Sequence, residues 1–148
     1  MIVLDKDTRV FTLHTQNTTY QMKADENRVL LHTYYGPRVG GGDLSYLIQY
    51  ADRGFCPNPS ELGRRRDYSL DALPQEYSTC GVGDFRLPSA QVEQPDGSRL
   101  LDLRYESCEA RPGKYALEGL PAFHGAEGET LSVLLRDPSS SLEVELLY

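Results

Sequence analysis

The sequence predicts an all-β fold, an antiparallel β-sandwich with one long ordered irregular loop. Three observations lead to this prediction. Short segments in which apolar and polar residues alternate recur on both sides of the middle of the chain, separated by turn-forming residues. No segment has the apolar spacing of a long α-helix. The middle, residues 51–88, has no periodicity but carries aromatic and apolar residues that disordered segments lack.

Four strands are expected before the long loop. Each combines alternating or β-branched residues with turn residues at its end. They are residues 11–15, 18–22, 29–35 and 44–49. Gln16-Asn17 suits a two-residue hairpin turn between the first two strands. The third is apolar enough along its length to be buried on both faces of a sheet.

Four further strands are expected after the long loop, at residues 90–94, 100–109, 130–135 and 142–148. The first two form the clearest hairpin in the sequence, because Pro95-Asp96-Gly97 between them is strong turn chemistry. In the last strand, alternation is still running at Tyr148. This unfinished pattern predicts that residues 1–148 are the front part of a larger sandwich domain, incomplete at its C-terminus.

Composition argues against several classes of function. The 148 residues have the size of one domain, and a net charge of −7 argues against sequence-independent nucleic-acid binding. No membrane partner is expected, because no apolar run approaches the roughly 18 residues of a membrane helix. The start of the chain lacks the features of a secretion signal. Three cysteines without a CxxC pair favour a reduced, cytoplasmic location over a disulfide framework.

The spacing of reactive residues picks out no catalytic or metal-binding constellation. His14, His32 and His124 are far apart in the sequence and the cysteines are scattered, so neither a metal nor a cofactor is expected. Among the 22 acidic residues, spacing singles out no pair for glycosidic-bond chemistry. Catalytic roles are therefore assigned to none of these positions.

The long loop is the part of the sequence with recognition chemistry. Its arginines and aspartates, among them Asp52 and the Arg66-Asp67 pair, offer the guanidinium and carboxylate groups that hold sugar hydroxyls. Its tyrosines and phenylalanines offer rings that stack on the face of a pyranose. The same charges can also pair with one another and hold the loop folded. From spacing alone, this internal pairing is favoured over a polar-ligand loop.

Several short motifs occur in the order in which a known family has them. They are DLSYL (43–47), DRGF (52–55), YSLD (68–71), LPQEY (73–77), GDFR (83–86), PDGS (95–98), DLRY (102–105) and GLPA (119–122). In these motifs the chain resembles the N-terminal domain of family 36 α-galactosidases, over nearly its whole length.

The resemblance implies a modular parent enzyme. Its N-terminal domain would be a β-sandwich of the supersandwich type, followed by a (β/α)8 barrel and a small C-terminal β domain. The barrel would carry the two catalytic aspartates of a retaining hydrolase acting on terminal α-galactosides, such as raffinose-type oligosaccharides or melibiose. Because these 148 residues contain no barrel, the resemblance gives this chain a non-catalytic role and assigns it no catalytic residue.

The resemblance also implies where the long loop acts. Bacterial members are typically tetramers in which a loop of the N-terminal domain reaches into a neighbouring subunit's pocket and meets the terminal galactose. The matching residues here are Asp52, Arg53, Phe55 and Arg66. The adjacent Arg64 and Arg65 leave the register of Arg66 open. Cys56 and Cys80 depart from the small hydroxyl and aromatic residues that the family often has there.

Two alternatives to this role stay open. The first is a stand-alone carbohydrate-binding module that keeps the loop without the barrel. The second is a purely structural assembly domain in which the loop charges serve subunit contacts and no sugar.

Overall fold

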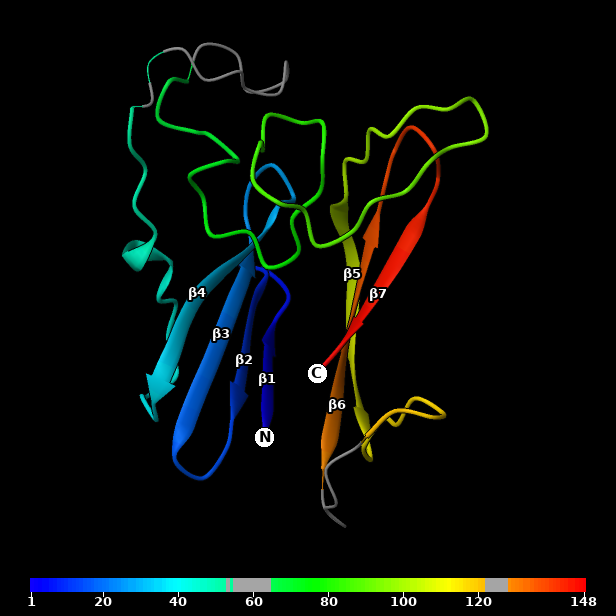
Figure 1. Ribbon diagram of the computed structural model, residues 1–148. Helices are drawn as coiled ribbons and strands as arrows, with labels where there is room; N and C mark the ends of the chain where they lie inside the picture. Colours follow the sequence, from blue (N-terminus) through cyan, green and yellow to red (C-terminus); the bar gives the residue numbers. More distant parts are fainter. Residues whose placement is uncertain (53, 55–64, 122–127) are drawn as a thin grey trace.

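The computed structural model describes residues 1–52, 54, 65–121 and 128–148. Its strands form two antiparallel sheets that face each other (Figure 1). The first sheet has the order β1-β2-β3-β4, with β1 at Ile2–Asp5, β2 at Val10–His14, β3 at Thr18–Ala24 and β4 at Leu30–Pro37. The second has the order β5-β6-β7, with β5 at Arg104–Pro112, β6 at Glu129–Arg136 and β7 at Glu143–Leu147. The predicted all-β antiparallel sandwich is thereby confirmed.

The main core lies between the two sheets. Alternate positions of both sheets, and the segment that leads into β5, send apolar side chains into it. These buried side chains are Phe11, Met22, Ala24, Leu30, Leu101, Leu103, Leu131, Val133 and Leu135. The rings of Phe11 on β2 and Tyr105 on β5 have their centroids 5.4 Å apart, so an aromatic pair spans the two layers.

Strand predictions are confirmed where a strand pairs with its neighbour in sequence. β2 pairs with β3 from Val10 opposite Lys23 to His14 opposite Thr19. β6 pairs with β7 in the same antiparallel manner. Burial on both faces is confirmed only for the start of β4, where Leu30 faces the main core and Leu31 the opposite side. Further along this strand the prediction is wrong, because Tyr35 is 68% exposed.

The predicted strand at residues 44–49 is wrong. A short 3-10 helix, η1 at Ser45–Leu47, lies there instead. Side chains from β3 and from the preceding turn hold this segment in a turned conformation. The Asp43 carboxylate accepts a hydrogen bond from the Ser45 backbone at 2.8 Å and pairs with Lys23 at 2.6 Å, while Gln21 Oε1 accepts from the Leu44 backbone at 2.9 Å.

The predicted hairpin at residues 90–109 is also wrong, although its turn exists. The Gly97 N–H donates to Gln94 O at 2.8 Å, and Gly97 has a φ of 83°, which glycine adopts readily. Residues 91–94, however, form no strand, and β5 pairs with β6. The sequence prediction missed β1, whose four residues pair with β2.

The described part of the long loop is ordered, as predicted, and builds a second core on the outer side of β4. Val29 and Leu31 pack there against three buried loop residues, Tyr68, Leu70 and Leu73. The loop also continues the sheet for a few residues, because the His32 N–H donates to Pro74 O at 2.7 Å and the Glu76 N–H to Leu30 O at 2.9 Å. Phe85 of the same loop is 76% exposed and takes no part in this second core.

Candidate functional site

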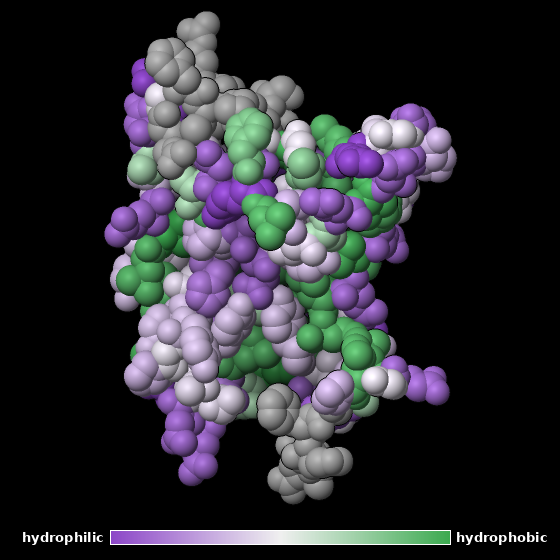
Figure 2. Space-filling model, in the orientation of Figure 1, coloured by the Kyte–Doolittle hydropathy of each residue, from purple (hydrophilic) through white to green (hydrophobic). Residues whose placement is uncertain are grey.

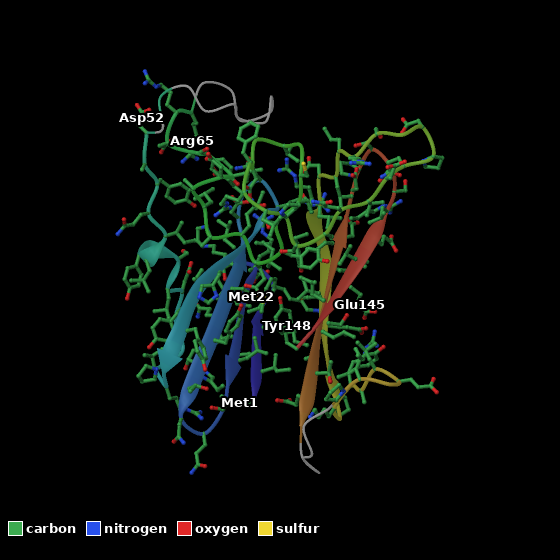
Figure 3. All side chains as sticks on the ribbon, in the orientation of Figure 1. Met1, Met22, Asp52, Arg65, Glu145 and Tyr148 are labelled. Atoms are coloured by element: carbon green, nitrogen blue, oxygen red, sulfur yellow. The ribbon has the colours of Figure 1, made fainter. Side chains whose placement is uncertain are left out.

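Two of the predicted site residues lie side by side within the long loop. Asp52 and Arg66 are 14 positions apart in the sequence, yet the Arg66 Nε atom lies 3.2 Å from Asp52 Oδ2. Both side chains are more than half exposed, at 55% and 66%. Figure 3 shows Asp52 at the outer end of the molecule, beyond both sheets. The pair therefore presents a carboxylate and a guanidinium to solvent.

The backbone beside Asp52 is turned by the same carboxylate. Asp52 Oδ1 accepts a hydrogen bond from the Gly54 N–H at 2.7 Å, an Asx-type turn. Gly54 has a φ of 72°, in the left-handed region that glycine adopts without steric cost. The DRGF motif thus places its aspartate at a sharp turn. The other two predicted site residues, Arg53 and Phe55, lie outside the described residues.

Arg65 has a different environment from its neighbour. Its guanidinium carbon lies 5.6 Å from the ring centroid of Tyr50 and 5.7 Å from that of Tyr68. It also pairs with Glu26 at 2.6 Å and with Asp67 at 3.1 Å. Hydrogen bonds to Asp67 raise the pKa of the Arg65 guanidinium, and the same bonds lower the pKa of the Asp67 carboxyl. Arg65 is held by the protein, whereas Arg66 faces outward.

Arg86 and Asp84, in the described part of the loop, follow the internal-pairing interpretation. Arg86 donates to the backbone oxygens of Leu70 at 2.6 Å and Leu73 at 3.0 Å, and pairs with Asp84 at 2.8 Å. Burial would raise the pKa of the Asp84 carboxyl, but the bonds from Arg86 outweigh it and hold that pKa below its usual range. This pair stabilises the loop and leaves the exposed Asp52–Arg66 pair as the candidate for recognition.

Sequence reasoning singled out Tyr68 in the YSLD motif but missed Tyr50, the other tyrosine that contacts Arg65. Tyr50 precedes Asp52 by two positions, and Tyr68 follows Arg66 by two. This symmetric spacing is the signal in the sequence that two segments could pair here, with the tyrosines on one side of the Asp52–Arg66 pair. In the described part of the chain, no group of three or more histidine, cysteine or acidic side chains is placed to hold a metal ion. None of the helices described there is long and apolar enough to cross a membrane.

Comparison with known proteins places the chain in a family. Residues 28–148 match the model of the glycosyl hydrolase family 36 N-terminal domain. The chain belongs to this family. It is 46% identical over 149 residues to the bifunctional α-galactosidase/sucrose kinase AgaSK of Mediterraneibacter gnavus, a match that covers 99% of the chain and 16% of that relative. It is 38% identical to α-galactosidase Mel36A of Lactobacillus acidophilus, over all of the chain and 20% of the relative.

In solved structures of the family, one region has the same fold as this family 36 N-terminal domain. The galactosidase domain of AgaSK superposes with a TM-score of 0.93 at 45% identity, and the match covers 100% of this chain and 21% of that one. A variant of AgaA from Geobacillus stearothermophilus in complex with raffinose has a TM-score of 0.84 at 38% identity, over 94% of this chain and 20% of the other. The chain spans about a fifth of the length of these relatives.

Proposed function

We propose that this chain is the non-catalytic N-terminal part of an α-galactosidase that hydrolyses terminal α-galactosides by a retaining mechanism. The parent would be a cytoplasmic homo-oligomer that needs no metal or cofactor from this domain. Membership of the family 36 N-terminal domain supports this proposal, as do relatives whose names give α-galactosidase activity. Raffinose and stachyose are the sugars in two of the related complexes.

The proposed role of the loop is to complete the sugar pocket of a neighbouring subunit. The observation that carries it is the exposed Asp52–Arg66 pair. A carboxylate accepts from adjacent sugar hydroxyls while a guanidinium donates to their oxygens, so the pair offers both kinds of contact at one point. Arg53 and Phe55, in the same motif, would add a second cation and a ring.

The position of the pair favours a sugar bound by another molecule. Asp52, which pairs with Arg66, stands at the outer end of the fold, away from the core between the sheets (Figure 3). A single projecting ion pair covers only a small part of a galactose. The other contacts, and the catalytic groups, would come from a barrel on the neighbouring subunit. The isolated chain is therefore expected to be inactive on nitrophenyl α-galactosides.

A chimera tests the proposal, with this chain in place of the aligned region of AgaSK. Asp52→Asn and Arg66→Met are expected to raise KM for raffinose roughly 10- to 100-fold, the worth of a hydrogen bond to a charged group. The value of kcat should change little, because the contact is made in both the ground state and the transition state. Arg99→Met is the matched control, since that arginine is 72% exposed and pairs only with Glu93 among the described residues.

The outcomes separate the three candidate roles. An unchanged KM with altered subunit assembly would favour the purely structural domain. Binding of galactose or melibiose to the isolated chain with a Kd tighter than about 1 mM would favour the stand-alone module. A folded but inactive unsubstituted chimera would contradict the proposal that the chain supports this enzyme.

A further inference from the structure

Residues 50–52 and 65–68 contact each other in a compact arrangement, which we call the stem. The Tyr50 and Tyr68 rings are stacked with centroids 6.2 Å apart and an interplanar angle of 28°. The Arg65 guanidinium lies within 6 Å of both ring centroids. One arginine thus contacts both sides of the stem at once. Asp52 and Arg66 stand immediately beyond this contact, one on each side.

The stem is anchored to the first sheet through Tyr68. That side chain is 1% exposed, and its hydroxyl donates to the Asp25 carboxylate. Asp25 in turn accepts from the backbone N–H groups of Asn27 and Val29, both at 2.9 Å, in the turn before β4. The turn before β4 therefore fixes Asp25, Asp25 fixes the Tyr68 hydroxyl, and the Tyr68 ring contacts Arg65.

Arg65 also connects the stem directly to the turn between β3 and β4, where Glu26 lies. Its Nη1 atom donates to Glu26 at 2.6 Å, and Nε and Nη2 donate to the two carboxylate oxygens of Asp67 at 3.1 and 3.2 Å. A planar guanidinium can donate along its edge and stack on rings with its face, and a lysine ammonium cannot do both. The geometry requires arginine at this position.

We propose that Arg65 is a positioning residue. By joining Tyr50 to Tyr68 and both to the turn between β3 and β4, it fixes the separation of the two sides of the stem and so brings Asp52 and Arg66 together. This inference rests on the proposed function of that pair in sugar binding. Adjacent arginines then have separate roles, with Arg66 facing the ligand and Arg65 holding the loop that carries it.

Amide hydrogen exchange on the isolated chain tests the structural part without any sugar. Arg65→Met is expected to accelerate exchange in residues 48–52 and 65–70 by about 2- to 30-fold, the range that a cation–π contact is worth. Strands β3 and β6 should keep their protection, which shows that the variant is folded. Arg99→Met, at an exposed arginine outside the stem, is the matched control and should leave the stem unchanged.

Substitutions of Tyr50 identify the contact that matters. Tyr50→Phe keeps the ring and is expected to behave as the unsubstituted chain, whereas Tyr50→Ala should accelerate exchange as Arg65→Met does. The double variant should be no faster than either single variant, because both remove the same contact. Additive effects, or no effect of Arg65→Met, would overturn the inference.

The KM for raffinose in the AgaSK chimera tests the positioning role. Arg65→Met should raise KM with little change in kcat, and adding it to Arg66→Met should cause no further rise. A further rise would mean that Arg65 contacts the sugar itself, and faster exchange with an unchanged KM would mean that the stem does not position the pair. Both results overturn the inference while the effect of Arg66→Met upholds the proposed function. If Arg66→Met has no effect, the proposed function fails, and the exchange data decide the role of Arg65 in the stem.

Discussion

The carboxylate of Glu76 connects both sheets to the long loop. Glu76 lies in the loop, and its backbone N–H bonds to β4. Its side chain, 9% exposed, accepts hydrogen bonds from the Tyr20 hydroxyl on β3 at 2.6 Å and from the Tyr148 hydroxyl beyond β7 at 2.8 Å. Burial and this negative charge raise the pKa of both tyrosines, so their hydroxyl groups stay protonated as donors. One side chain therefore stabilises the contact among three parts of the fold.

We expect Glu76→Gln to lower the free energy of unfolding by about 1–3 kcal/mol, because charge-assisted hydrogen bonds in a nearly buried site are lost. Chemical denaturation of the isolated chain measures the change. Glu93→Gln is the control, since Glu93 is 60% exposed and its ion pair with Arg99 is worth little. The control should stay within about 0.5 kcal/mol of the unsubstituted chain. Equal effects of the two substitutions would mean that Glu76 does not connect the sheets.

Single residues also mark the limit of sequence prediction at this site. The motifs selected Asp52 and Arg66, and the structure places these two together. The motifs did not distinguish the roles of Arg65 and Arg66. Two successive arginines are alike in the sequence, and only the folded backbone decides in which direction each side chain points. Glu76 could not be found either, since its partners Tyr20 and Tyr148 are 56 and 72 positions away.

At the scale of elements, the turn between β6 and β7 depends on one buried acid. Asp137 is 0% exposed, and its carboxylate accepts from the backbone N–H groups of Asp102 at 3.1 Å, Ser139 at 2.7 Å and Ser140 at 3.2 Å. It therefore closes the turn and also holds the segment that leads into β5. Burial would raise the pKa of this carboxyl, but the backbone donors outweigh burial and hold the pKa below 3.8.

Asp137→Asn should therefore lower the free energy of unfolding and make that free energy less dependent on pH in the acidic range. Near neutral pH, a loss of about 1–3 kcal/mol is expected, because an amide group cannot accept from all of these donors. A carboxyl whose pKa is lowered by folding contributes stability above its unfolded pKa of 3.8, and this contribution is lost as pH falls through the folded pKa. Unfolding free energies measured from about pH 6 to about pH 2 should fall less steeply in the variant.

Asp96→Asn is the matched control for this prediction. Asp96 also accepts a backbone hydrogen bond in a turn, from Ser98 at 2.9 Å, but it is exposed. Its substitution is expected to have the smaller effect. If the two substitutions cost the same, burial of the Asp137 carboxylate adds nothing to the turn.

Periodicity predicted elements well where the partner strand is the next one in sequence. The β2–β3 and β6–β7 hairpins are of this kind, and their turns carry the expected residues. Residues 91–94 show the same alternation, but they form no strand, and β5 pairs with β6. The segment at residues 44–49 had strand-like composition, and bonds from Gln21 and Asp43 turned it into a 3-10 helix. At residues 44–49, tertiary contacts thus outweighed the local pattern.

At the scale of the whole molecule, one edge strand of each sheet receives backbone hydrogen bonds from elsewhere in the described part of the chain. Loop residues 74–76 bond to the edge of β4 near its start, and Arg28 O accepts from the Tyr105 N–H at the edge of β5. In the described part of the chain, no backbone hydrogen bond is made on the outer edge of β7. Figure 2 shows a band of hydrophobic side chains along the second sheet. This side of the molecule therefore offers both unpaired backbone and apolar surface.

The isolated chain is accordingly expected to self-associate through β7. An uncovered edge strand is a template for pairing with another chain, and a second copy of β7 is the partner that high protein concentration supplies. Because Glu143 and Glu145 bring like charges to such a contact, association should strengthen as added salt screens their repulsion. Light scattering across a range of protein and salt concentrations measures the mass. A monomer at all of these concentrations would show that the edge is closed in solution.

A second variant separates this edge from the other apolar surface. Phe85 and Leu87 are 76% and 88% exposed in the long loop, and they offer a different route to association. Replacing both with serine should leave β7-mediated association unchanged, because neither residue belongs to that strand. Loss of association in this variant would assign the contact to the loop. In the AgaSK chimera, where further polypeptide follows residue 148, association through β7 should disappear if that polypeptide covers the edge.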